Sequence, residues 1–226
     1  MTSLYGILAL LAAAFLAYFN PKGKKSGDLV DILEDVLNQQ KPTKPLPSKV
    51  IQDWDCIPFV KFGPFKKDFS ERDILKIVGT EHLSRLELPL DEENIKYSSI
   101  LFGGTNDELI IDWYASAPYT KIECVRAHHD GTHWKTPEGI TVGTPLEVLE
   151  KINQASFPFY GLEWEHSGLV SEWNGGLVKN GVSVNLIALN PAAAIPFLVG
   201  ESVFSSDQSE AIQSDMEVVS MEVKMN

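Results

Sequence analysis

Residues 50–226 contain short runs of alternating apolar and polar residues, separated by glycine, proline, asparagine and aspartate. In an extended chain, alternation with a period of two places the apolar residues on one face, which can pack against a core. These runs therefore predict β-strands. Strands are expected at residues 97–102, 109–114, 122–127, 157–164, 168–173, 182–188 and 218–223. The turn at 103–108 predicts a hairpin between the first two strands, and Asn174-Gly175-Gly176 predicts a second hairpin, of 170–173 with 177–178.

Two short helices are expected among these strands. Each begins with a hydroxyl residue followed three positions later by a carboxylate, as in a capping box: Ser70 with Asp73, and Thr144 with Glu147. Pro145 suits the first position of the second helix. The residues expected to end the two helices in a left-handed conformation are Gly79 and Asn153.

Corresponding residues of the two helices are 74 positions apart. One interpretation is an internal duplication, in which residues 48–226 form two similar halves of strand, short helix and antiparallel strands. The other is that two independent helices obey the same capping rules. Both lead to the same fold class, an α+β domain of antiparallel sheets with short capped helices.

Residues 1–21 carry no charged side chain, and 4–19 are almost entirely apolar. A helix of this length spans roughly 24–31 Å, about the thickness of the hydrocarbon core of a bilayer. We therefore expect an uncleaved transmembrane anchor; a signal peptide and a buried helix are the alternatives. The lysines that follow, Lys22, Lys24 and Lys25, favour a cytoplasmic domain, whereas a signal peptide would export it to the cell envelope.

Residues 22–47 join this segment to the domain. Apolar residues recur at helical spacing between 26 and 40, which predicts an amphipathic helix that docks on the domain or on a partner. Three prolines at 42–47 then end the helix and form a stiff linker.

The net charge of −12 repels nucleic-acid backbones and anionic lipid, so nucleic-acid binding is not expected. With 44% hydrophobic residues, the chain can bury a core. It contains none of the nucleotide-binding, zinc-protease or serine-hydrolase motifs, and no catalytic residue or cofactor can be assigned from it. Cys56 and Cys124 are either two buried thiols or, in an exported domain, one disulfide.

The best metal-ligand candidates are His128, His129 and His133, which flank Asp130-Gly131. If that dipeptide is the turn of a hairpin, His128 lies opposite His133 and two imidazoles share one face. Zinc would still need a third ligand, which no nearby sequence supplies at standard spacing. The alternative is an exposed polar hairpin tip.

Two further groups of residues are candidate sites. Glu163 and Glu165 share one face of an expected strand beside His166, which is the arrangement of either an acid–base pair or a solvated face. Tryptophans could form a stacking platform for a ligand, but most stand in strand-like alternation that favours the core. They are Trp54, Trp113, Trp134, Trp164 and Trp173.

Several stretches between residues 56 and 223 resemble a family of uncharacterised bacterial proteins, many of them anchored or exported. They include Phe62-Gly63-Pro64, Trp134-Lys135-Thr136, residues 139–144 and 159–164, and Trp173-Asn174-Gly175-Gly176. This resemblance implies no activity and no functional residues. More remotely, the helix start at 139–148 is similar to the repeat of beta-lactamase inhibitory proteins and of small outer-membrane assembly lipoproteins, which implies a binding module.

These observations favour a single-pass, membrane-anchored, non-enzymatic binding module with a protein partner. A metal-assisted hydrolase that uses His128 and His133 is the alternative enzyme hypothesis. A structural component of the cell envelope is the third.

Overall fold

The structure is a computed structural model that describes residues 50–90, 94–194 and 197–226. The expected anchor, the amphipathic helix at 26–40 and the proline linker lie outside the described residues. Within the described ranges, no helix is both long and apolar enough to cross a bilayer.

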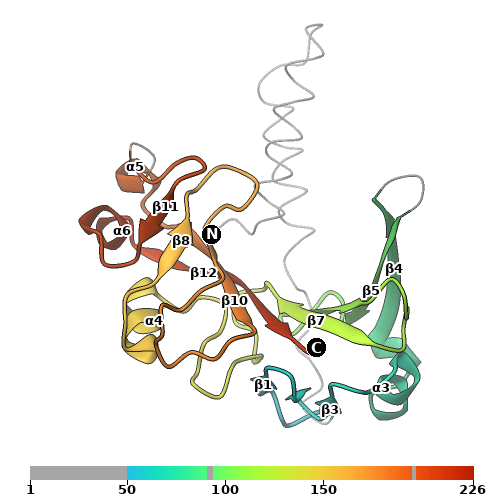
Figure 1. The fold of residues 1–226 in the computed structure, drawn as a ribbon. Helices are drawn as coiled ribbons and strands as arrows, with labels where there is room; N and C mark the ends of the chain where they lie inside the picture. Colours follow the sequence, from blue (N-terminus) through green and yellow to red (C-terminus); the bar gives the residue numbers. More distant parts are fainter. Residues whose placement is uncertain (1–49, 91–93, 195–196) are drawn as a thin grey trace, which may run out of the picture.

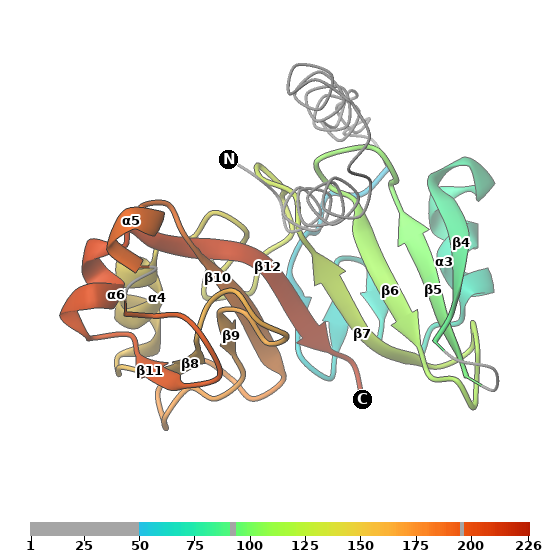
Figure 2. The same ribbon diagram turned by 90° about the horizontal axis from the view of Figure 1, so that it is seen from above.

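A seven-stranded antiparallel sheet forms the centre of the fold, in the order β4-β5-β6-β7-β12-β10-β9 (Figure 2). Its first four strands form a simple meander, and the long strand β12 joins them to β10 and β9. The strands are β4 (Leu83–Pro89), β5 (Ile95–Leu101), β6 (Leu109–Trp113), β7 (Ile122–Ala127), β9 (Leu169–Val170), β10 (Val182–Ala188) and β12 (Met216–Lys224).

Short elements lie around this sheet: α3 lies at one end, α4, α5 and α6 lie at the other end with β8 and β11, and β1 and β3 lie between (Figure 1). One small sheet contains β1 (Cys56–Ile57), β2 (Lys61–Phe62) and β3 (Phe65–Lys66), and another pairs β8 (Pro158–Tyr160) with β11 (Val203–Ser205). The helices are α3 (Glu71–Val78), η1 (Thr80–His82), α4 (Leu146–Asn153), α5 (Pro191–Ala194) and α6 (Ser209–Gln213). The expected α+β fold with antiparallel sheets is confirmed.

The two faces of the large sheet differ in chemistry. On one face, alternate residues such as Ile111, Trp113 and Val125 are buried in the core. On the other face, the buried carboxylate of Asp112 accepts a 2.7 Å hydrogen bond from the Ser98 hydroxyl and forms ion pairs with Lys96 and Arg126. The period-two alternation in the sequence thus separates a core face from a polar face.

The strands expected from the alternation are present; β7 has the expected bounds, and most of the others begin or end at different residues. β10 has the bounds expected of it, and β5 pairs with β6 as the first predicted hairpin. The expected strands at 157–164 and 168–173 shorten to three and two residues. The alternation did not predict β1, β2, β3, β4 and β11.

The capping box of α3 is confirmed. The Ser70 amide and hydroxyl both donate to the Asp73 carboxylate, at 3.2 and 2.7 Å. The helix ends at Gly79, whose φ of 85° needs a residue without a Cβ and whose amide donates to the Leu75 carbonyl.

The capping box expected for α4 is wrong. Thr144 turns its hydroxyl to the Thr141 carbonyl, 2.7 Å away, and Pro145 is the N-cap instead of the first helical residue. At the other end, Gln154 takes the left-handed conformation expected of Asn153. Asn153 is the last residue of the helix, and its buried amide group bonds to the backbone of Trp173 and Val178.

The second predicted hairpin is also wrong. Asn174 and Gly175 do adopt positive φ, as turn residues should, but the chain that follows them is not a strand. Leu177 donates its amide to the Asn153 carbonyl instead, and β9 pairs with β10. The turn therefore connects the sheet to the end of α4.

Candidate functional site

Two consecutive carboxylates end the turn between β5 and β6, and each faces histidine from the segment after β7. The register pairs Leu109, at the start of β6, with Ala127, at the end of β7. Glu108 and His128 are therefore the next residues outward on neighbouring strands. The antiparallel register brings acid and imidazole together although they are far apart in sequence.

The first group consists of Glu108, His128 and His129, whose ligand atoms all lie within 4.8 Å of one another. The two imidazole Nε2 atoms stand 3.5 and 3.7 Å from the same Glu108 oxygen, Oε1. The second oxygen, Oε2, accepts a 2.9 Å hydrogen bond from the Gly104 amide, which fixes the carboxylate. The three side chains are 19, 11 and 17% exposed, so this group is sheltered yet reaches solvent.

Burial and charge set the protonation of this group. Burial and, to a smaller extent, the neighbouring His129 lower the pKa of His128 to about 4, and Glu108 offsets only part of this shift. Burial alone would raise the pKa of Glu108, but hydrogen bonds from His129 and the Gly104 amide lower it overall. At neutral pH the group therefore contains a neutral imidazole at His128 and an ionised carboxylate.

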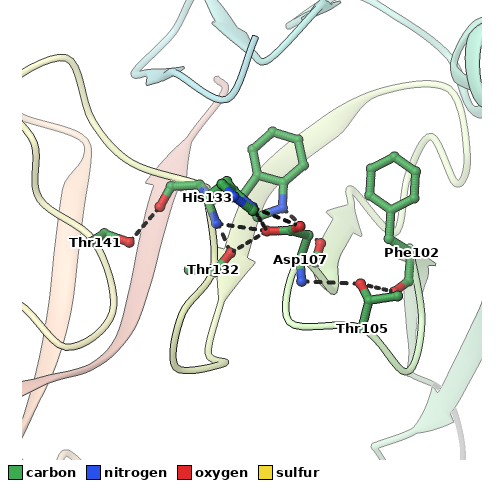
Figure 3. Close-up of polar contacts among 7 residues, drawn as sticks. Phe102, Thr105, Asp107, Thr132, His133 and Thr141 are labelled. Carbon is green, nitrogen blue, oxygen red and sulfur yellow. Dashed lines mark hydrogen bonds and ion pairs between the residues drawn. The ribbon is translucent and has the colours of Figure 1, made fainter. Parts of the chain in front are cut away.

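The second group is centred on the buried Asp107 (Figure 3). Its carboxylate lies 3.0 Å from His133 Nδ1 and accepts hydrogen bonds from the His133 amide, at 2.7 Å, and the Thr132 hydroxyl, at 3.3 Å. The His133 side chain is 67% exposed and stacks at 5.1 Å on Trp54. A carboxylate at Nδ1 orients an imidazole and selects its tautomer, so Asp107 is a positioning residue for His133.

Backbone-directed hydrogen bonds hold this second group in place (Figure 3). The Trp134 indole donates to the Asp107 carbonyl at 2.8 Å, and the Asp107 amide donates to the Thr105 hydroxyl. That hydroxyl in turn donates to the Phe102 carbonyl, and Thr141 donates to the Trp134 carbonyl. Trp134 is fully buried, so the group is attached directly to the core.

The structure thus separates the histidines that the sequence placed together. Asp130 and Gly131 do form a turn, with the Thr132 amide donating to the His129 carbonyl, but no hairpin follows because β7 pairs with β6 and β12. The expectation that His128 faces His133 is therefore wrong. Sequence reasoning missed Asp107 and Glu108, although the predicted strands 109–114 and 122–127, paired as neighbours, would have placed Glu108 beside His128.

The other candidates lie elsewhere. Glu163, Glu165 and His166 are exposed, and the strand expected to align them ends at Tyr160. Among the tryptophans, Trp113, Trp134 and Trp173 are buried in the core, as their alternation predicts. Cys56 and Cys124 are both buried and free, and burial raises the pKa of each thiol.

A second candidate site is a projecting arm at the end of the β4–β5 hairpin, comprising residues 88–90 and 94–96. β6 pairs with β5 from Tyr97 onward, so the arm continues past the sheet as a two-stranded ribbon (Figure 1). Leu88 pairs with Lys96, and the Leu90 amide donates to the Asn94 carbonyl at 2.8 Å. The hairpin therefore remains regular where the sheet no longer supports it.

The arm exposes apolar side chains on both of its faces. Leu88, Leu90 and Ile95 are 44, 67 and 39% exposed. Leu88 and the neighbouring Pro89 point to opposite faces, and Ile95 pairs with Pro89, so Leu88 and Ile95 lie on opposite sides of the ribbon. Residues 91–93, which connect the two strands in the sequence and lie outside the described residues, are Asp, Glu and Glu.

The base of the arm is held by a buried carboxylate. Glu71, at the start of α3, accepts hydrogen bonds from Arg85 on β4, at 2.6 and 2.9 Å, and from Ser99 on β5, at 2.7 Å. The Trp113 indole donates to the same Ser99 hydroxyl at 2.9 Å. Arg85 also stacks 4.0 Å above the ring of Tyr119. These contacts tie β4, β5 and α3 together just below the arm.

No protein-family model, curated protein or solved structure matches the chain.

Proposed function

We propose that the chain is a non-enzymatic binding module, anchored in a membrane by residues 4–19, that recognises a protein partner through the arm. The observation that supports this proposal most is the exposure of Leu88, Leu90 and Ile95 on a ribbon that extends beyond the last residue of β5 paired with β6. Clustered exposed apolar side chains are typical of interaction sites in soluble domains.

The network below the arm favours recognition. Because Glu71, Arg85 and Ser99 already hold the two strands, binding need not order them, and less conformational entropy is lost on association. A regular ribbon also presents side chains at fixed spacing. The arm therefore has the preorganisation expected of a recognition element.

The chemistry of the arm defines the partner. The exposed side chains of Leu88, Leu90 and Ile95 would bind in an apolar groove. The acidic residues 91–93 would pair with basic groups at the rim of that groove. The same acids, together with the net charge of −12, disfavour an anionic lipid surface. We therefore propose a protein partner with an apolar groove bordered by lysine or arginine. The three lysines after the anchor favour a cytoplasmic location for both.

We expect Leu88→Asp and Leu90→Asp, made together in the full chain, to weaken partner binding by at least about thirtyfold. A charge in the buried centre of an interface costs at least about 2 kcal/mol, or roughly thirtyfold in affinity. The measurement is the amount of each protein co-isolated with the full chain from solubilised native membranes. Because both leucines are exposed, the double variant should fold as stably as the wild type.

Leu177→Asp serves as the matched control, because Leu177 is 59% exposed and lies outside the arm. The expected result is one protein that is retained by the wild type and by this control and lost from the arm variant. Equal retention by all three chains, or equal loss from both variants, would contradict a binding role for the arm.

A further inference from the structure

We propose that Glu108, His128 and His129 bind one divalent transition-metal ion, with zinc as the best fit. Neither the arm nor partner binding is needed for this inference. It replaces His133, which the sequence suggested as a ligand, with a carboxylate from the turn before β6.

The spacing of the donor atoms matches a tetrahedral ion. Zinc binds imidazole nitrogen and carboxylate oxygen at about 2.1 Å, so two ligands of a tetrahedral site lie about 3.4 Å apart. The two Nε2 atoms lie 3.5 and 3.7 Å from Glu108 Oε1. All three donor atoms lie within 4.8 Å of one another. Small rotations of the imidazoles can shorten these distances to those of a metal site. Two of the three distances between donor atoms are thus already close to the value that a tetrahedral site requires.

A backbone hydrogen bond holds the proposed carboxylate ligand in place. A ligating carboxylate is normally held by a hydrogen bond to its other oxygen, and Glu108 Oε2 accepts such a bond from the Gly104 amide. The backbone register of β6 and β7 sets the distance between Glu108 and His128. The carboxylate ligand is therefore positioned independently of the ion.

The donor set indicates which ion would bind. Two imidazoles and one carboxylate suit zinc and its neighbours in the first transition series, whereas magnesium and calcium prefer oxygen ligands alone. Three protein ligands leave one coordination position, and the partial exposure of the three side chains lets water fill it. The site is therefore of the open, three-ligand type.

The test uses the detergent-solubilised full chain carrying an affinity tag without histidine, stripped with a chelator and titrated with zinc against a chromogenic indicator. We expect one zinc ion per chain. Glu108→Gln and His129→Asn should each weaken binding at least about tenfold, and cobalt in place of zinc should give the visible absorption of a tetrahedral site. Circular dichroism checks that each variant is folded.

His133→Asn is the matched control, since His133 is a neighbouring histidine that faces Asp107 instead. It should bind zinc as tightly as the wild type. The inference is wrong if the folded wild type binds no zinc, if Glu108→Gln binds it as well as the wild type, or if His133→Asn loses as much affinity as His129→Asn.

Discussion

Replacing Glu71 with alanine is expected to lower the free energy of unfolding by about 3 kcal/mol. The Glu71 carboxylate is 6% exposed and accepts hydrogen bonds from Arg85 and from the fully buried Ser99. Without it, the Ser99 hydroxyl has lost its acceptor in the core, which costs about 1–3 kcal/mol. The two hydrogen bonds from Arg85 contribute less to the free energy of unfolding than their number suggests, because the Arg85 side chain is 58% exposed.

Chemical denaturation of the variant, compared with Glu147→Ala, measures this effect. Glu147 is a matched control because it is also in the first turn of a helix, α4, but is exposed. The control should change stability by less than about 0.5 kcal/mol. If both substitutions had equal effects, the Glu71 network would not hold the base of the arm. Glu71→Ala should in addition weaken partner binding, since the arm is no longer held in one conformation.

Acid is expected to destabilise the domain between about pH 6.5 and pH 4 through His128. Burial lowers the pKa of His128 from 6.5 to about 4, so in this window the unfolded chain binds a proton that the folded chain does not. Stability therefore rises with pH and is lost as the pH falls, by up to about 1.4 kcal/mol per pH unit and about 3 kcal/mol in all. Glu108 adds to this loss at the lower end of the window. Its pKa is lower in the folded chain than in the unfolded chain, so acid also removes the stability that its ionised carboxylate contributes.

The measurement is the free energy of unfolding of the metal-free chain at several pH values. His128→Asn should flatten the dependence between pH 6.5 and 4, because asparagine does not titrate. His166→Asn, which removes an exposed histidine, should leave the dependence of the wild type unchanged. Parallel curves for the wild type and His128→Asn would show that burial does not lower the pKa of His128.

The strands of the central sheet could be predicted where alternation coincides with burial. β10 alternates buried and half-buried residues from Val182 to Ile187 and has the expected bounds. β4 could not be predicted because it is an edge strand on which most residues are exposed. Its residues therefore do not alternate between buried and exposed. The strands β1, β2 and β3 have two residues each, too few for any period to be visible.

Predicted helix ends failed where tertiary contacts compete with local rules. Thr144 satisfies the capping pattern, yet its hydroxyl bonds within the preceding turn. Asn153 was expected to take the left-handed conformation that ends the helix, but it stays helical and its side chain bonds to the buried backbone of Trp173 and Val178. Capping rules describe one helix end in isolation, and here the core determines the outcome.

Only some residues of the candidate sites could be predicted from the sequence, since pairing between strands brings these residues together. His128 and His129 drew attention as neighbours, but Glu108 joins them through the β6–β7 register. No sequence pattern singles out Glu71, because its partners Arg85 and Ser99 are 14 and 28 positions away. The arm depends on β6 being shorter than β5, which no local pattern shows.

Site-specific photocrosslinking tests the binding role of the arm most directly. A photoreactive amino acid replaces Leu90 or, as the control, Leu177 in the full chain, and native membranes are irradiated before solubilisation. The account predicts one discrete protein adduct from position 90, which is absent from position 177 and disappears when Leu88→Asp is added. No adduct from position 90, or the same adducts from both positions, would contradict recognition of a protein partner through the arm.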